Sequence, residues 1–330
     1  MNNNIKIFFL SIFILNINLF AQFNKNDSVK VLMRQFIEHD ENGLLFGFYN
    51  IELDTLSIIT AGKINKGDDL KLACPTTKSC LSYIFLKEKI NLDATINNWY
   101  PKEIGYTKSD SITLRMLLYN TSGIQEYIKF IKIDPNEIIT PEETITLAYQ
   151  DQKLDFAPGY QYSYSNTNFN ILGKILENIK KENINTIIKE YFHQNFPSLR
   201  MDDGKGNYPS GYVKPWPYHW SATGFAGGLV GTAEDAIKVF AFISQQPEFE
   251  QMTNWIVDKN KSNHLVGMGI FALKDFGKFG TVIMYDGDMM ANKMLLMKIG
   301  NTVYYFHTTY SVDLENLINF AKNVITLINQ

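Results

Sequence analysis

The sequence lacks the features that would point to a nucleic-acid-binding, metal-dependent or repeat protein. Its 330 residues carry a net charge of -3, with both signs scattered, so it offers no basic surface for nucleic acid and no polybasic patch for a membrane. The five histidines stand apart from one another and from acidic clusters, so we expect no metal site and no other cofactor. No internal repeat and no low-complexity tract is present.

Cysteine is scarce, because only Cys74 and Cys80 occur in the chain. In an exported protein such a pair suggests a disulfide. If both residues lie in one helix, a rise of about 1.5 Å per residue places their Cα atoms roughly 9 Å apart, beyond the usual limit of about 7 Å. We therefore expect two free thiols, unless the helix starts after Cys74.

A long apolar run occurs only at the N-terminus. Lys6 precedes an apolar stretch over residues 7–20, and a small residue follows it, which is the pattern of a cleaved signal peptide over residues 1–21. A membrane anchor is the weaker alternative, since the run is short for a span of roughly 20 residues and contains Asn16 and Asn18. We expect export to the periplasm or beyond, with no stable membrane anchor after cleavage.

The two ends of the mature chain have α/β character. Apolar spacing predicts an N-terminal helix, two strands around a turn, and three late strands followed by a helix with Ser311 as its N-cap. These elements are expected over residues 28–38, 43–62, 282–284, 294–299, 303–308 and 311–328. Both ends are thus predicted to form one antiparallel sheet flanked by helices.

The middle of the chain is predicted to be mostly helical. Capping boxes are expected at Thr140–Glu143 and Thr232–Asp235, and residues 204–217 are expected to form a long surface loop. The fold class is therefore α/β, an antiparallel sheet with an inserted helical region. The sheet region is predicted over 22–75 and 265–330, and the helical region over 76–264, together forming one domain.

Four segments in order carry a family resemblance. They are Thr77–Lys78 before an apolar helix, Asn120–Gly123, Pro158–Asn166 and Gly227–Asp235. This order resembles the β-lactamase-related serine hydrolases, which include class C β-lactamases, D-alanyl-D-alanine peptidases and their esterase relatives. The resemblance covers nearly the whole mature chain and implies a β-lactamase/transpeptidase-like fold; it does not by itself establish function.

The resemblance implies three relay residues. Lys78 falls on the lysine of the S-x-x-K motif, whose amine takes the proton of a serine one helical turn earlier. Tyr164 and Asn166 fall on the Y-x-N element. In active relatives the tyrosine oxygen shuttles the serine proton, and the asparagine amide holds the lysine and the substrate carbonyl. We expect the three side chains to converge within hydrogen-bonding distance.

The departures from the family pattern matter more for function than the matches do. Pro75 stands where the serine nucleophile belongs. The third motif, K-T-G or H-x-G in relatives, aligns with Tyr285 to Gly287, and bulkier residues over 288–292 are expected to crowd the cleft floor. Asn120 stands where relatives often have histidine. We expect Tyr285, Gly287 and Asn120 to be binding residues, and the sequence leaves open whether Tyr285 lines the cleft or fills it.

Cys74 is the one candidate for a replacement nucleophile. It lies four residues before Lys78 on the same helical face and is a candidate N-cap, with Pro75 at the first helical position. A helix N-terminus and an ammonium both lower a thiol pKa. The alternative, which we favour, is a buried cysteine that packs as a small apolar side chain. This helix is predicted to run from Lys78 to Leu92 and Asp93, about one turn shorter than in relatives.

Two functions from different classes follow. The first is a pseudoenzyme that cannot form the serine acyl-enzyme and binds a small molecule, peptide, cell-wall fragment or protein in its cleft. The second is a hydrolase of esters or amides that uses Cys74 or an activated water as nucleophile, with Lys78 and Tyr164 as the relay.

Overall fold

The computed structural model describes the chain from residue 25 onward, with short gaps. The described residues are 25–100, 108–132, 134, 136–150, 153–204, 206–211, 218–289 and 292–330. The predicted signal peptide over residues 1–21 lies outside this part, as does the end of the predicted loop at 212–217. Within the described part, no helix combines the length and the apolar character needed to span a membrane.

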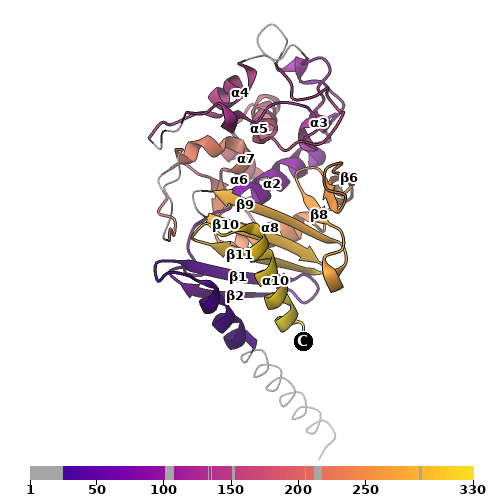
Figure 1. The fold of residues 1–330 in the computed structure, drawn as a ribbon. Helices are drawn as coiled ribbons and strands as arrows, with labels where there is room; N and C mark the ends of the chain where they lie inside the picture. The colour runs from indigo at the N-terminus through magenta and orange to yellow at the C-terminus, as the bar shows by residue number, and fades with distance from the viewer. Residues whose placement is uncertain are drawn as a thin grey trace, which may run out of the picture.

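Strands from both ends of the chain form one antiparallel sheet, as the sequence predicts (Figure 1). Its order is β2-β1-β11-β10-β9-β8-β7-β6. The strands are β1 Gly43–Asn50, β2 Thr55–Gly62, β6 Ile256–Val257, β7 His264–Val266, β8 Phe271–Leu273, β9 Val282–Met289, β10 Asn292–Ile299 and β11 Thr302–Thr308. The sheet thus joins sequence segments from opposite ends of the chain, with β1 paired to β11 from Leu44↔Thr308 to Asn50↔Thr302.

Helices cover both faces of this sheet, which explains why its central strands are apolar on both sides. In β10, Leu295 and Met297 pack with the helix over residues 25–36 and with α10 (Leu314–Ile328). Met294 and Leu296 face the other layer, which contains α2 (Ala73–Lys87) and α8 (Ala233–Ile243). Gly47 in β1 lets α8 approach closely, because a Cβ there would lie 2.5 Å from Cδ1 of Ile237.

Several of the remaining helices, among them α3, α4, α5 and α7, lie above the large sheet in Figure 1, and three further strands form a second, small sheet. These remaining helices are η1 Ile96–Asn98, α3 Leu114–Leu118, η2 Tyr127–Lys129, α4 Pro141–Tyr149, α5 Asn166–Lys180, α6 Ile184–Phe192, η3 Trp220–Thr223, α7 Gly224–Gly227, α9 Glu248–Met252 and η4 Gly277–Phe279. The small sheet has the order β3-β5-β4, with β3 Leu70–Lys71, β4 Arg200–Met201 and β5 Leu229–Gly231.

Several predicted boundaries are wrong: the helix expected over 28–38 spans 25–36, and two other differences have identifiable reasons. The N-cap of α10 is Asp313 and not Ser311, since an oxygen of Asp313 accepts the Glu315 amide at 2.8 Å. Strand β9 extends past residue 284 to Met289, because it stays paired with β10 as far as Asn292↔Met289. The longer β9 carries the third motif next to α2.

The two predicted capping boxes differ. At α4 the box is confirmed, with the side chains and backbone of Thr140 and Glu143 bonded in both directions. At α8 only half of the box forms: Thr232 accepts the amide of Asp235 at 3.3 Å, while the Asp235 carboxylate accepts the hydroxyl and amide of Ser198. The carboxylate therefore ties α8 to the segment before β4.

His307 is expected to make folding sensitive to acid. It is 1% exposed in β11, its Nδ1 lies 3.1 Å from the Tyr305 hydroxyl, and burial lowers its pKa to about 3. In the unfolded chain the His307 imidazole takes up a proton below a pKa of about 6.5, whereas the folded chain keeps it neutral. The neutral, buried imidazole therefore contributes to stability above about pH 6.5, and this contribution is lost as the pH falls. Between about pH 7.5 and about pH 5 we expect a loss of about 2 kcal/mol from this residue.

Urea unfolding at several pH values checks this expectation. His307→Gln is expected to flatten the dependence of the free energy of unfolding on pH, and exposed His193→Gln at the end of α6 is the matched control. Equal slopes for the wild type and His307→Gln would contradict the assignment.

Candidate active site

Lys78 lies at the centre of the site and is completely buried. It belongs to the second turn of α2 and is 0% exposed. Its Nζ donates to Oδ1 of Asn166 at 2.8 Å and to the carbonyl oxygen of Ala226, in α7, at 2.6 Å. The rings of Tyr164 and Phe169 face the same ammonium at 5.3 and 5.2 Å. Oxygen acceptors and ring faces together satisfy a cation that water does not reach.

Asn166 and Tyr164 enter the site from the start of α5. Asn166 is the first residue of this helix, and its Oδ1 accepts both the Lys78 ammonium and the Tyr164 hydroxyl, the latter at 3.0 Å. Tyr164 is 37% exposed. The predicted convergence of Lys78, Tyr164 and Asn166 is therefore present; Tyr164 is the most exposed of the three, Asn166 is partly exposed and Lys78 is buried.

Asn120 lies behind the site and not at its surface. It is 2% exposed and has a left-handed backbone with φ of 55°. Its Oδ1 accepts the amide of Ser165 at 3.2 Å and the side-chain amide of Asn168 at 2.8 Å. The expectation that Asn120 contacts a ligand directly is thus corrected: it supports the segment that carries Tyr164 and Asn166.

Tyr285 fills space beside the site, which settles the alternative that the sequence left open. It is 3% exposed, and its ring stacks on Phe271 with centroids 4.8 Å apart. Phe271 in turn lies 6.4 Å from the ring of Tyr164, so Tyr285 supports an aromatic wall. Gly287 is also buried and pairs with Met294 within the sheet, so it too lies away from the surface.

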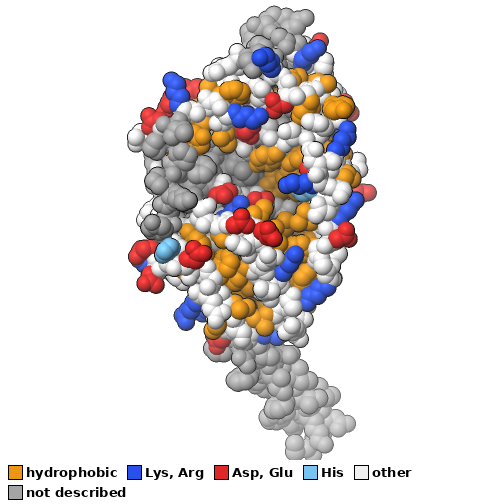
Figure 2. All heavy atoms as spheres, in the orientation of Figure 1, with side chains coloured by type: hydrophobic (Ala, Val, Ile, Leu, Met, Phe, Trp, Pro, Cys, Tyr) orange, Lys and Arg blue, Asp and Glu red, His pale blue; other side chains and the backbone are white. Residues whose placement is uncertain are grey.

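Carboxylates lie near this wall, since the charge of Asp286 acts on His264, whose ring stacks on Phe271. Asp286 and Asp288 are 40% and 45% exposed at the end of β9, beyond the residues of β9 that pair with β8. The Lys293 ammonium is 8% exposed and lies 3.2 Å from Asp286 and 3.5 Å from Asp288. Figure 2 shows acidic side chains in the middle of this face, over the strand labelled β9 in Figure 1. The carboxylates of Asp286 and Asp288 are thus more accessible to a ligand than the ammonium of Lys293.

Glu126 is a charged residue of the site that sequence reasoning missed. Its Oε2 accepts the backbone amide of Asn166 at 2.5 Å, and its Oε1 accepts the amide of Ile128 at 3.3 Å. The side-chain amide of Asn166 also hydrogen-bonds this carboxylate. Burial raises the Glu126 pKa, and the nearby Lys78 charge opposes that change. The sequence signal was weak, since a single acidic residue after Gly123 has no pattern around it.

The start of α2 corrects the expected position of Cys74. The N-cap is Leu72 and the helix begins at Ala73, so neither Cys74 as N-cap nor Pro75 at the first helical position is right. Both residues belong to the first turn, and their side chains lie outside the described part of the structure. The helix also ends at Lys87 and not at residues 92–93.

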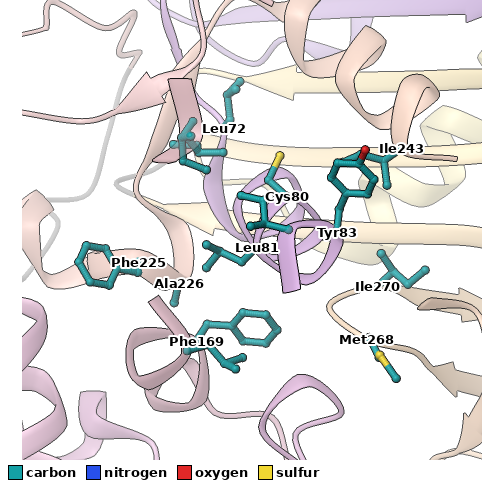
Figure 3. Packing of buried hydrophobic residues seen from close by; sticks show 14 of the residues in the cluster. Leu72, Cys80, Leu81, Tyr83, Phe169, Phe225, Ala226, Ile243, Met268 and Ile270 are labelled. Atoms are coloured by element: carbon teal, nitrogen blue, oxygen red, sulfur yellow. The ribbon is translucent and has the colours of Figure 1, made fainter. Parts of the chain in front are cut away.

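Cys80 follows the expectation of a free thiol. It is fully buried, and desolvation raises its pKa. Figure 3 shows it on α2 among apolar side chains of the core. A buried thiol with a raised pKa is a packing residue and not a nucleophile. Among the described residues, no group of three histidine, cysteine or acidic side chains is placed to bind a metal.

A family model and a curated relative each match part of this chain. The sequence model of the Beta-lactamase family matches residues 83–321, a range that begins after Lys78. Protein flp of Staphylococcus aureus strain MW2 is 26% identical over 201 residues, which make up 53% of this chain and only 38% of that protein.

Solved structures show the same fold. A D-stereospecific amidohydrolase from Streptomyces superimposes with a TM-score of 0.77 and 18% identity, over 89% of this chain and 97% of that one. A D-amino acid amidase from Ochrobactrum anthropi SV3, solved with L-phenylalanine amide, superimposes with a TM-score of 0.79 and 14% identity, over 93% of this chain and 99% of that one. The chain therefore belongs to the Beta-lactamase family and has the mixed α/β fold of these hydrolases.

Proposed function

We propose that this chain is an exported pseudoenzyme of the family, which binds a small ligand at Tyr164 and cannot form a serine acyl-enzyme. One observation carries the proposal: Lys78, Tyr164 and Asn166 are assembled, while the residue one turn before Lys78 in α2 is Pro75, which has no hydroxyl. Removing the attacking atom from such a site leaves binding and electrostatic stabilisation only. The apolar run over residues 7–20 supports export.

The ligand class follows from the wall of the site and the carboxylates near it. Phe271, with the buried Tyr285 packed behind it, forms an apolar wall next to Tyr164, which suits an aromatic or apolar group. Asp286 and Asp288 attract an amine and repel a carboxylate. An amino acid amide has an amine and no carboxylate; the Ochrobactrum amidase was solved both with such an amide and with phenylalanine, so the preference rests on Asp286 and Asp288. We infer that the ligand is a small amine that lacks a free carboxylate.

Calorimetric titration tests this proposal. Phenylalanine amide is expected to bind about tenfold more tightly than phenylalanine or N-acetylphenylalanine, a difference of about 1.4 kcal/mol. The Asp286→Asn/Asp288→Asn variant is expected to lose most of this preference. Asp54→Asn, in the turn between β1 and β2, removes a carboxylate far along the chain and is the matched control. Tighter binding of the carboxylates by the wild type would overturn the inferred ligand class.

A hydrolase remains the second candidate, because the exposed Tyr164 phenol lies beside a buried ammonium. That pair is the proton relay which an ester or amide hydrolase needs, with Cys74 or water as the nucleophile. Activated esters and a chromogenic β-lactam, offered to the wild type and to Cys74→Ala, separate the two functions. The pseudoenzyme predicts no turnover by either protein, and turnover that Cys74→Ala abolishes would establish the hydrolase.

A further inference from the structure

Glu126 and Lys78 approach Asn166 from opposite sides. Lys78 donates to the side-chain oxygen of Asn166, and the Glu126 carboxylate accepts both the backbone amide and the side-chain amide of the same residue. The positive charge of Lys78 therefore faces the oxygen of the Asn166 side-chain amide, and the negative charge of Glu126 faces its nitrogen. An asparagine held in this way has one orientation, since a flip would place nitrogen against the ammonium and oxygen against the carboxylate.

We propose that Glu126 is a positioning residue of this site, which fixes the Asn166 amide and keeps Lys78 as an ammonium. The proposal rests on the proposed function and deepens it, because a Lys78 that is charged near neutral pH organises the site and does not remove protons there. Lys78 is completely buried and needs a nearby negative charge to remain protonated without water. Glu126 supplies that negative charge, with the amide group of Asn166 between its carboxylate and the Lys78 ammonium.

The charged and titratable groups around Glu126 are consistent with this role. From α2 it faces Lys78, and at the start of α5 it faces Asn166 with Tyr164 beside it. On its own segment, the Lys129 ammonium is paired with Asp155 at 3.3 Å. Of these groups, Lys78 is the cation whose charge acts on Glu126.

The test is the pKa of Lys78, measured by NMR on protein labelled with ¹³Cε-lysine, with the signal assigned from the spectrum of Lys78→Arg. Glu126→Gln keeps the shape of the side chain and removes its charge, so the Lys78 pKa is expected to fall by about one unit or more. Asp155→Asn removes an exposed carboxylate from a neighbouring loop and is expected to leave the Lys78 pKa unchanged. Glu126→Asp retains the charge and is expected to restore most of the wild-type value.

An unchanged Lys78 pKa in Glu126→Gln would overturn the proposal, as would equal shifts in Glu126→Gln and Asp155→Asn. If Glu126→Gln does not fold, the same NMR titration of the wild type tests the proposal. The chemical shift of Lys78 Cε is expected to change over the pH range in which the Glu126 carboxyl titrates, and a chemical shift that does not change there would overturn the proposal. Both measurements are made without ligand. Failure of phenylalanine amide to bind would therefore count against the proposed ligand and leave the Glu126 result standing.

Discussion

Replacing Pro75 by serine is expected to convert the protein from one that resists acylation into one that a fluorophosphonate probe or a penicillin labels stoichiometrically. In α2, residue 75 precedes Lys78 by one turn, and side chains at this spacing have their Cβ atoms about 5–6 Å apart. Position 75 also lies in the first turn, where backbone amides have no partner within the helix, so serine is compatible with the local backbone.

The labelling rate is expected to depend on pH. A serine attacks only when a base takes its proton, and the role proposed for Glu126 keeps Lys78 protonated near neutral pH. We therefore expect slow labelling of Pro75→Ser near neutral pH, faster labelling as the pH rises, and a further increase in the Pro75→Ser/Glu126→Gln variant. Intact-protein mass spectrometry measures the adduct.

Three controls define the result. The wild type is expected to remain unlabelled, and Pro75→Ser/Lys78→Met is expected to lose the labelling that Pro75→Ser gains. A labelled wild type that becomes inert as Cys74→Ala would instead identify a thiol nucleophile. A folded Pro75→Ser protein that no probe labels would show that the changed third motif, with Tyr285 packed against Phe271, also prevents acylation.

The sequence predicts the parts of this fold that repeat a pattern. Alternating and continuous apolar runs define β1, β2, β10 and β11, and helical spacing defines α5 and α10. Strands β6, β7 and β8 escape prediction because they are two or three residues long, too short to show a period. Their pairing depends on β9, whose extent depends in turn on β10.

The same division holds for the site. Lys78, Tyr164 and Asn166 are predictable because each lies in a recognisable motif, and the structure brings them together. Glu126 was missed, since its role arises from a contact with α5 that no local pattern reveals. Packing of Tyr285 likewise depends on Phe271 from another strand. Long-range contacts decide the features that the local sequence leaves open.

Lys78→Met is expected to lower the free energy of unfolding by about 3–5 kcal/mol. The substitution preserves an unbranched side chain but removes the Lys78 donor from the Ala226 carbonyl and one of the two donors from Oδ1 of Asn166, and it leaves the Glu126 carboxylate without its nearby cation. Lys87→Met is a matched control in the same helix, because Lys87 is 46% exposed and lies 3.5 Å from Glu248. We expect the control to change stability by no more than about 0.5 kcal/mol in urea unfolding.

A double-mutant cycle then separates lost packing from an uncompensated charge. If the Glu126 carboxylate is stranded in Lys78→Met, neutralising it with Glu126→Gln removes part of the penalty. The double variant is therefore expected to be more stable than the sum of the two single losses predicts, by about 1 kcal/mol or more. Additive losses would show that Lys78 and Glu126 act independently. They would also assign the destabilisation to the lost hydrogen bonds from Lys78 to Asn166 and Ala226, with no contribution from coupling between the two charges.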